Sequence, residues 1–561
     1  MKPQKKLRET MKENDEFDYV IVGAGSAGCV LANRLSECGK YRICLLEAGG
    51  TDWHPMIHIP AGFVKTLINP KLNWMYVSEP SPGTNGRAIP APRGKVLGGS
   101  SSINGMGFNR GQAMDFDVWA QKGNRGWSYD DILPYFCRFE TYKSGGDLAY
   151  RGQNGEMTIT DLDWRDPLCE AYIDGANSLG IPRNPDYNGK AQEGISYLQR
   201  TVNGRTRMSA AKAFLNPAKK RPNLKVITNA HVTRLTLSGK QVTGISYHKG
   251  GVRGKQMHLK AAKEVIISGG AINSPQLLQL SGIGPASLLQ QLGIDVQHDL
   301  PGVGENLRDH YATRLTASVE GVQTINDRAH GIKLVGEVAK YCIGQQSILK
   351  LGPTTVFCFW RSKPGLTNPD VQINFTPGTH QRGMQSTLEK KSGFTLATWQ
   401  HRPESFGYVR SVTSDPFDKP EIQPNYLSDE EDQRVILDAA KLCRRLMQTD
   451  ALKPFQVKET YPGTSIQNDN ELLHSIRDIG QSIYHLMGTC RMGPINDPMA
   501  VVDDQLKVHG IDNLRVIDAS IMPTMISANL NAGVLMIAEK GADLVLGKTP
   551  LTMSDLQKQI T

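Results

Sequence analysis

The pattern of apolar and polar positions near the start of the chain predicts a strand, a turn, a helix and a second strand. An apolar run at 19–22 is followed by a glycine-rich turn, a helical stretch from Ser26 to Glu37 and a second apolar run at 42–46. Short apolar runs bounded by turn residues are typical of buried strands, and a helix commonly connects two parallel strands. We therefore expect a βαβ unit that begins near Phe17.

The middle of the chain has a different pattern. Strand-like runs at 371–375 and 394–399 lie among loops, and the charged amphipathic stretch from Asp429 to Met447 predicts a helix. Apolar strand and helix patterns return at 514–517 and 532–546. We therefore expect an α/β fold in which a discontinuous Rossmann-type domain is closed by the C-terminal part of the chain, and an α+β domain with an antiparallel sheet lies between its segments.

Charge and composition exclude several classes of protein. The net charge of +9 comes from 64 basic and 55 acidic side chains, and no block of Lys and Arg concentrates it, so nucleic acid is disfavoured as a partner. The longest apolar runs, such as 532–538, are too short for a transmembrane segment, while peripheral association with a membrane stays open. Nine scattered cysteines without a C-x-x-C pair favour a reducing cytoplasm and predict no metal site.

The turn between the first strand and the first helix predicts a dinucleotide site. Gly23, Gly25 and Gly28 form G-x-G-x-x-G, with Ser26 and Ala27 inside the motif. In this context the amides of the helix N-terminus bind a pyrophosphate. Glu47, followed by Ala48, ends the second strand, where a carboxylate binds an adenosine ribose. These features fit FAD or NAD equally well.

Three further segments decide between the two cofactors. Residues 93–108 (RGKVLGGSSSINGMGF) and 270–284 (GAINSPQLLQLSGIG) resemble the two signature motifs of the glucose-methanol-choline (GMC) oxidoreductase family. Residues 484–493 (YHLMGTCRMG), followed by 516–520 and 527–531, resemble its C-terminal catalytic segment. The resemblance extends from about residue 17 to 548 and implies an FAD enzyme that oxidises alcohols.

The resemblance also implies which residues hold FAD and how the domains divide. Ile103 stands where some members carry a histidine linked to flavin, so we expect non-covalent FAD. Besides the turn residues above, the expected FAD-binding residues are Arg93, Val96, Gly98, Ser102, Asn104, Gly105, Val232, Asp518, Ala519, Asn529 and Asn531. The expected FAD-binding domain covers 17–165, 205–315 and 478–550, the substrate-binding domain covers 166–204 and 316–477, and 1–16 form a flexible extension.

By the same resemblance, His485 is the catalytic base and Asn529 its partner. A neutral histidine can accept the hydroxyl proton near neutral pH, and an uncharged amide can donate to the developing alkoxide. Asn529 also has an alternative role as a cap of the following helix. The chain departs from the family at Leu486, where proline usually follows the histidine.

The substrate and the electron acceptor are less defined. If Phe357, Phe359 and Trp360 line the pocket, its wall is uncharged, which favours an uncharged primary alcohol and disfavours choline; these aromatics also fit a core. We expect a dehydrogenase that passes electrons to a quinone-type acceptor. The alternatives are an oxidase that reduces dioxygen to hydrogen peroxide and, from another class, a flavin-containing hydroxynitrile lyase.

Overall fold

The βαβ unit at the start of the chain lies in the centre of a seven-stranded sheet. In the computed structural model, which describes residues 15–381 and 387–558, this sheet has the order β11-β2-β1-β14-β13-β12, and β26 also pairs with β14. Strands β11, β2, β1, β14 and β26 run parallel to one another, while β13, which pairs with β14, and β12 extend the sheet as an antiparallel hairpin. The strands are β1 (Asp15–Val22), β2 (Ile43–Leu46), β11 (Leu224–Ile227), β12 (Ala230–Ser238), β13 (Gln241–Lys249), β14 (Lys255–Ile267) and β26 (Leu514–Val516).

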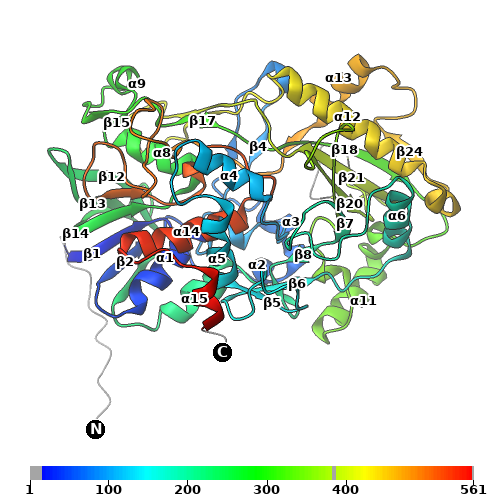
Figure 1. Ribbon diagram of the computed structural model, residues 1–561, viewed down its shortest axis with the longest axis horizontal. Helices are drawn as coiled ribbons and strands as arrows, with labels where there is room; N and C mark the ends of the chain where they lie inside the picture. The colour runs from blue at the N-terminus through cyan, green and yellow to red at the C-terminus, as the bar shows by residue number, and fades with distance from the viewer. Residues whose placement is uncertain (1–14, 382–386, 559–561) are drawn as a thin grey trace, which may run out of the picture.

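The last long helix of the chain packs on the first. Helix α1 (Ser26–Glu37) and α14 (Asn531–Val545) lie side by side next to this sheet, with α5 (Tyr129–Phe139) against α14 (Figure 1). The buried carboxylate of Glu539 accepts hydrogen bonds from Arg34 at 2.9 Å and Arg138 at 2.6 Å. The N-terminal and C-terminal parts of the chain therefore form one structural unit.

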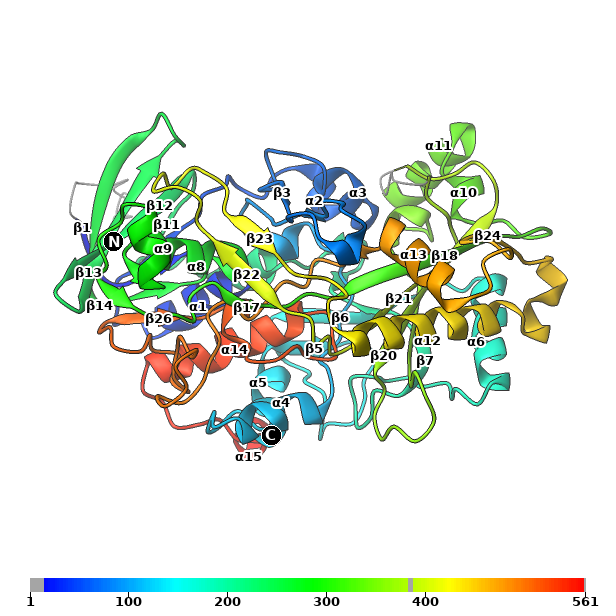
Figure 2. The ribbon, with the colours of Figure 1, turned by 90° about the horizontal axis from the view of Figure 1, so that it is seen from above.

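A second seven-stranded sheet is antiparallel throughout. Its order is β24-β18-β21-β20-β19-β7, and β25 pairs with the start of β18. Helix α12 (Glu430–Met447) packs across one face of it (Figure 2). The strands are β7 (Gly194–Tyr197), β18 (Tyr311–Ser318), β19 (Val356–Trp360), β20 (Val371–Thr376), β21 (Gly393–Gln400), β24 (Lys458–Tyr461) and β25 (Gln481–Ser482).

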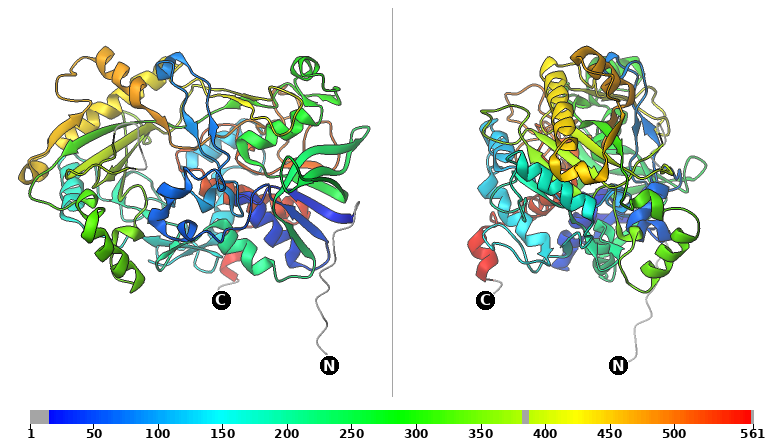
Figure 3. Two further views of the ribbon diagram at one scale, coloured as in Figure 1. Left: turned by 180° about the vertical axis from the view of Figure 1, so that it is seen from behind. Right: turned by 90° about the vertical axis from the view of Figure 1, so that its right-hand side faces the viewer.

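Shorter elements connect the two sheets. Seen from above and from behind, the segment with β3, β4, α2 and α3 crosses between them (Figures 2 and 3). The remaining strands are β3 (Tyr76–Val77), β4 (Pro90–Ala91), β5 (Glu140–Tyr142), β6 (Met157–Asp161), β8 (Gln199–Arg200), β9 (Val202–Asn203), β10 (Thr206–Arg207), β15 (Ile283–Gly284), β16 (His298–Asp299), β17 (Glu305–Leu307), β22 (Gly407–Arg410) and β23 (Glu421–Gln423). The remaining α-helices are α2 (Pro55–His58), α3 (Phe63–Thr66), α4 (Ala113–Gln121), α6 (Pro167–Ser178), α7 (Asn216–Ala218), α8 (Gly270–Leu280), α9 (Ala286–Gln291), α10 (Ile325–Arg328), α11 (Gly331–Cys342), α13 (Asp469–Ile479) and α15 (Met553–Lys558).

The expected fold class, a Rossmann-type domain with an antiparallel α+β domain, is confirmed. Strand β18 belongs to the second sheet from Tyr311 onward, so we propose a domain boundary before residue 311 rather than after 315. The extension expected over 1–16 lies outside the described residues up to 14, and 15 and 16 belong to β1. Within the ranges that the structure describes, no helix combines the length and apolar character needed to cross a membrane.

Candidate active site

A cavity of about 780 Å³ lies between the two sheets. One half is lined by the glycine turn, the ends of β2 and β14, and the start of α14. The other half is lined by the face of the antiparallel sheet that is opposite to α12. A cavity of this size is within the usual range for a cofactor or small ligand, and it joins a nucleotide-type motif to a separate wall that can select a second molecule.

The glycine turn has the geometry of a pyrophosphate cradle. Gly23 has a φ of +99°, and a Cβ there would lie 2.5 Å from the backbone oxygen of Ser268. Gly25 lines the cavity, and a Cβ there would find its nearest neighbour 4.0 Å away, so the space beside this backbone is open. Gly28 faces the turn, because its Cβ would lie 1.9 Å from the Gly23 oxygen. Ser26 and Ala27 line the cavity at the N-terminus of α1, where the free backbone amides of a helix can bind an anion.

The second glycine-rich segment packs directly on this turn. Gly99 has a φ of +52°, and a Cβ there would lie 2.7 Å from the Cα of Gly25. The Gly98 amide donates to the Ala24 oxygen at 2.7 Å, and the Ser102 hydroxyl donates to the Leu97 oxygen at 2.7 Å. Gly98, Ser102 and the buried Val96 therefore support the loop without lining the cavity, whereas Arg93, Asn104 and Gly105 line it.

The other expected FAD-binding residues also line the cavity: Glu47, Ala48, Val232, Asp518, Ala519, Asn529 and Asn531. The Glu47 carboxylate accepts the Ala24 amide at 2.9 Å and the Gly49 amide at 2.8 Å, and burial raises its pKa to about 7. Asn531 accepts the Ser26 hydroxyl at 2.8 Å, so the start of α14 is tied to the glycine turn. This donor and acceptor set fits a dinucleotide with its pyrophosphate at α1 and its ribose near Glu47.

Three polar side chains form a hydrogen-bonded chain at the cavity wall: His485 and Asn529 line the cavity, and the buried His310 lies behind His485. His485 Nδ1 lies 2.9 Å from His310 Nδ1, and His485 Nε2 lies 3.2 Å from Asn529 Nδ2. The other ring nitrogen of His310 lies 2.7 Å from the backbone oxygen of His401. Burial lowers the pKa of His310 to about 4. The pKa of His485 is held well below its usual value, chiefly by burial and to a smaller extent by the neighbouring His310 and Arg93. Both imidazoles are therefore neutral at pH 7.

These contacts determine which nitrogen of His485 is the base. A carbonyl can only accept, so His310 Nε2 carries a proton and His310 Nδ1, in the neutral ring, is an acceptor. His485 Nδ1 must then be the donor of the shared hydrogen bond. The lone pair of His485 is consequently on Nε2, where it accepts the amide hydrogen of Asn529.

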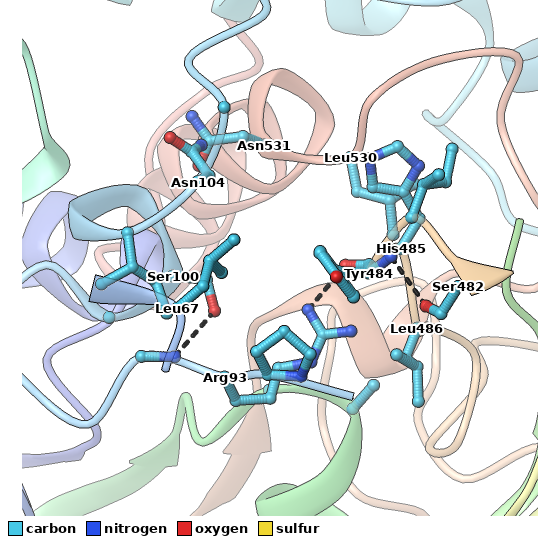
Figure 4. A pocket seen from close by; sticks show the side chains of 18 of the residues that line it. Leu67, Arg93, Ser100, Asn104, Ser482, Tyr484, His485, Leu486, Leu530 and Asn531 are labelled. Carbon is cyan, nitrogen blue, oxygen red and sulfur yellow. Dashed lines mark hydrogen bonds between the residues drawn. The ribbon is translucent and has the colours of Figure 1, made fainter. Parts of the chain in front are cut away.

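The loop that carries His485 is held in a strained conformation. Tyr484 is a non-glycine residue with a φ of +70°. The buried Asp309 carboxylate accepts the His485 amide at 2.7 Å, and Ser482 accepts the Tyr484 amide at 2.7 Å. Arg93 donates to the Tyr484 oxygen at 2.7 Å, and His485 and Ser482 lie close to Tyr484 (Figure 4). Several hydrogen bonds therefore orient the base.

The aromatic residues expected to line the substrate pocket divide into three positions. Phe357 lines the cavity. Phe359 is fully buried against Tyr187, and Trp360 packs with Val371 and Val435 beside α12, so neither lies at the cavity. Side chains alternate along a strand, so Trp360 lies on the opposite face of β19 from Phe359. Phe359 lies on the same face as Phe357, but the cavity does not extend to it.

Sequence reasoning did not select His310, Asp309 or Arg314. His310 and Asp309 are adjacent and precede β18, and Arg314 lies within that strand and lines the cavity. The alternation of polar and apolar positions in 311–318 is a signal for a strand with one polar face, but it does not say what that face meets.

Comparisons with known proteins agree with this architecture. Residues 17–312 and 403–538 match the N-terminal and C-terminal parts of the GMC oxidoreductase family. The chain is 41% identical over 550 residues to an oxygen-dependent choline dehydrogenase of Photobacterium profundum, covering 97% of this chain and 95% of the relative. It is also 41% identical over 561 residues to the mitochondrial choline dehydrogenase of Homo sapiens, covering 97% and 92% of the two chains.

Solved structures show the same fold. Pyridoxine 4-oxidase from Mesorbium loti has a TM-score of 0.85 and 31% identity, covering 95% of this chain and 99% of that one. A formate oxidase of Aspergillus oryzae has a TM-score of 0.88 and 26% identity, covering 96% and 99%. With both halves of the family pattern matched and the curated relatives aligned over nearly their full length, the chain belongs to the GMC oxidoreductase family.

Proposed function

We propose that this protein is an FAD-dependent enzyme that oxidises a primary alcohol to an aldehyde, with His485 as the base. The observation that carries the proposal is the hydrogen-bonded chain His310–His485–Asn529, which presents an Nε2 lone pair beside the dinucleotide cradle. When bound, FAD supplies the acceptor for the hydride that leaves the carbinol carbon. The glycine turn, Glu47 and the start of α14 would hold it.

His485 and Asn529 act in sequence on the hydroxyl group. Nε2 has one lone pair, so the substrate hydroxyl takes the place of the Asn529 amide as its donor. The released amide hydrogen then donates to the alcohol oxygen, which becomes negative as its proton moves to Nε2. A fixed neutral donor at this position stabilises developing charge without competing for the proton.

The mode of FAD binding and the acceptor are parts of the same proposal. Ile103, which is buried and lines the cavity, has no nucleophilic atom for a flavin link, so the flavin is bound non-covalently. The acceptor in this proposal is quinone-type and dioxygen is the alternative, because the human relative is named a choline dehydrogenase while the Photobacterium profundum relative is named oxygen-dependent. Acid precipitation should leave the yellow chromophore in the supernatant, and reoxidation by a soluble quinone should be faster than by air.

The decisive experiment is anaerobic mixing of the purified yellow protein with a panel of alcohols. Loss of flavin absorbance with formation of an aldehyde is expected, and His485→Ala should keep the flavin but slow its reduction by at least about a hundredfold, as expected for losing a general base. Flavin that stays oxidised with every alcohol, or a variant as fast as the wild type, contradicts the proposal. Cyanide release without bleaching would identify a lyase instead.

A further inference from the structure

Arg314, on the substrate side of the cavity, forms no ion pair with any carboxylate of the residues that the structure describes. It lies on β18, lines the cavity and is partly buried. Of its five N–H donors, only Nη1 has an acceptor among the described residues, the side-chain oxygen of Gln481 at 3.2 Å. By contrast, the buried Arg110 and Arg151 both form ion pairs with Glu140.

The electrostatic surroundings of Arg314 agree with this geometry. Burial lowers its pKa, and the partner that opposes this shift is the phenol of Tyr484 rather than a carboxylate. A guanidinium stays charged at neutral pH even so. A cation that is partly removed from water and lacks an anionic partner is stabilised when a ligand brings one.

The register of the sheet places Arg314 in a row of side chains that face the cavity. Arg314 is opposite Ala397, Ala397 is opposite Asn374, and Asn374 is opposite Phe357. Because neighbouring strands are about 4.8 Å apart, the small Ala397 leaves a gap between Arg314 and Asn374, whose backbones are about 10 Å apart. The side-chain oxygen of Asn374 already accepts a hydrogen bond from the side chain of Gln372, so the side-chain NH₂ group of Asn374 is left to act as a donor.

Arg314, Ala397 and His485 line the same cavity. Gln481, the hydrogen-bond partner of Arg314, precedes His485 by four residues, which span at most about 14 Å of chain. A molecule whose hydroxyl meets His485 can therefore extend across Ala397 to the guanidinium.

We propose that the alcohol substrate carries an oxyanion, of which a carboxylate is the best geometric match, and that Arg314 binds this group. This inference rests on the proposed alcohol oxidation and names its substrate class. The planar fork of a guanidinium pairs with a carboxylate through two parallel hydrogen bonds. It replaces the uncharged alcohol expected from Phe357, Phe359 and Trp360, because those residues lie on β19 whereas the charge lies on β18, three strands away in the same sheet. The net charge of +9 also favours the approach of anions.

One carboxylate, Glu389, lines the same half of the cavity and would favour a cation instead. It forms no ion pair with Arg314 among the described contacts, and a second guanidinium, that of Arg87, lies on this side and donates to the backbone oxygens of Arg477 and Gly480. His380 adds no charge, because burial and the charge of Arg314 lower its pKa to about 4. The wall is therefore more positive than negative.

The first test measures binding without turnover. The FAD-loaded protein is titrated with pentanoate and with pentanamide, its uncharged isostere, while the flavin spectrum or the heat of binding is recorded. Pentanoate should bind at least tenfold more tightly than the amide, and Arg314→Met should remove this difference. Arg314→Lys should keep part of it, and Arg445→Met, the same substitution at an exposed position of α12, should leave it unchanged.

Equal affinity for pentanoate and pentanamide, or a preference that survives in Arg314→Met, overturns the inference. So does choline binding more tightly than pentanoate in a manner that Glu389→Gln abolishes. Pentyl phosphate in place of pentanoate distinguishes the two oxyanions: tighter binding of the phosphate that depends on Arg314 supports the anion site and identifies a phosphate ester as its ligand.

The second test connects the site to catalysis. ω-Hydroxy carboxylates of increasing length, from glycolate upward, are compared with the parent alcohols in anaerobic flavin reduction. At one chain length the carboxylate should raise kcat/KM at least tenfold, mainly through KM. Arg314→Met should cancel this gain, whereas the exposed control Arg445→Met should keep it. If no alcohol reduces the flavin but pentanoate still binds through Arg314, the proposed function fails and the anion site stands.

Discussion

Replacement of His310 tests the assignment of the base most directly. In His310→Leu, the Nδ1–H of His485 loses its acceptor, which lies 2.9 Å away in a buried site. An unsatisfied buried donor costs about 1–3 kcal/mol, and if this cost falls on the reactive arrangement of the ring, flavin reduction should slow about five- to 150-fold. The ring can avoid the cost by changing tautomer, but Nε2 would then carry a proton toward the Asn529 amide and could not accept the substrate proton.

The matched variant His310→Asn separates hydrogen bonding from packing. The amide oxygen of asparagine takes nearly the position of Nδ1 in histidine and restores an acceptor, whereas leucine has similar size and none. Stopped-flow reduction under anaerobic conditions should show that Asn recovers most of the rate that Leu loses. Flavin content and melting temperature serve as controls for folding. If Leu is as fast as the wild type, or if Asn and Leu are equally slow, the hydrogen-bonded relay does not determine the tautomer.

Four further outcomes follow from the structure. Because the pKa of His485 lies below 6.5, chiefly through burial, the base is already neutral above that pH, so the reduction rate should be flat from about pH 6.5 upward and fall only toward acid; a rise from neutral to alkaline pH would disagree. In Asn529→Ala, reduction per bound flavin should be about 10²- to 10³-fold slower, as measured by stopped flow. In Gly99→Ala the new Cβ would approach Gly25 to 2.7 Å, so a loss of about 1–3 kcal/mol should appear as FAD release, monitored by flavin fluorescence. Glu539→Gln leaves the buried Arg34 and the half-buried Arg138 without full compensation and should lower the free energy of unfolding by about 3–5 kcal/mol in a denaturant titration, while the reduction rate per bound flavin stays unchanged.

The cofactor half of the site was largely predictable because its signals are local. The glycines at 23, 25 and 28, the helix after them and Glu47 at the end of the next strand act through backbone geometry that a short stretch of sequence defines. Most of the residues expected there line the cavity, and the others support the loops that do. His485 and Asn529, 44 positions apart, were selected through a family resemblance, and the structure places them 3.2 Å from each other.

The substrate half depends on contacts that sequence does not encode locally. His310 reaches His485 across 175 positions of the chain, and nothing in its own neighbourhood marks it among thirteen histidines. Likewise, alternation within β19 shows which positions share a face but not where the cavity ends, so Phe357 and Phe359 could not be distinguished. Arg314 was not selected because the sequence does not show which arginines lack a carboxylate partner in the folded protein.

The pairing of α1 with α14 has a consequence for biosynthesis. Arg34 and Glu539 are separated by 505 positions, so at the roughly 5–20 residues that a ribosome adds each second, the first helix waits about 25–100 s for the last. Throughout that interval the nascent glycine turn lacks the helix that completes its pocket. Capture of FAD is therefore expected only after α14 has been synthesised, and cells short of riboflavin should accumulate an aggregation-prone apoprotein that already contains this helix.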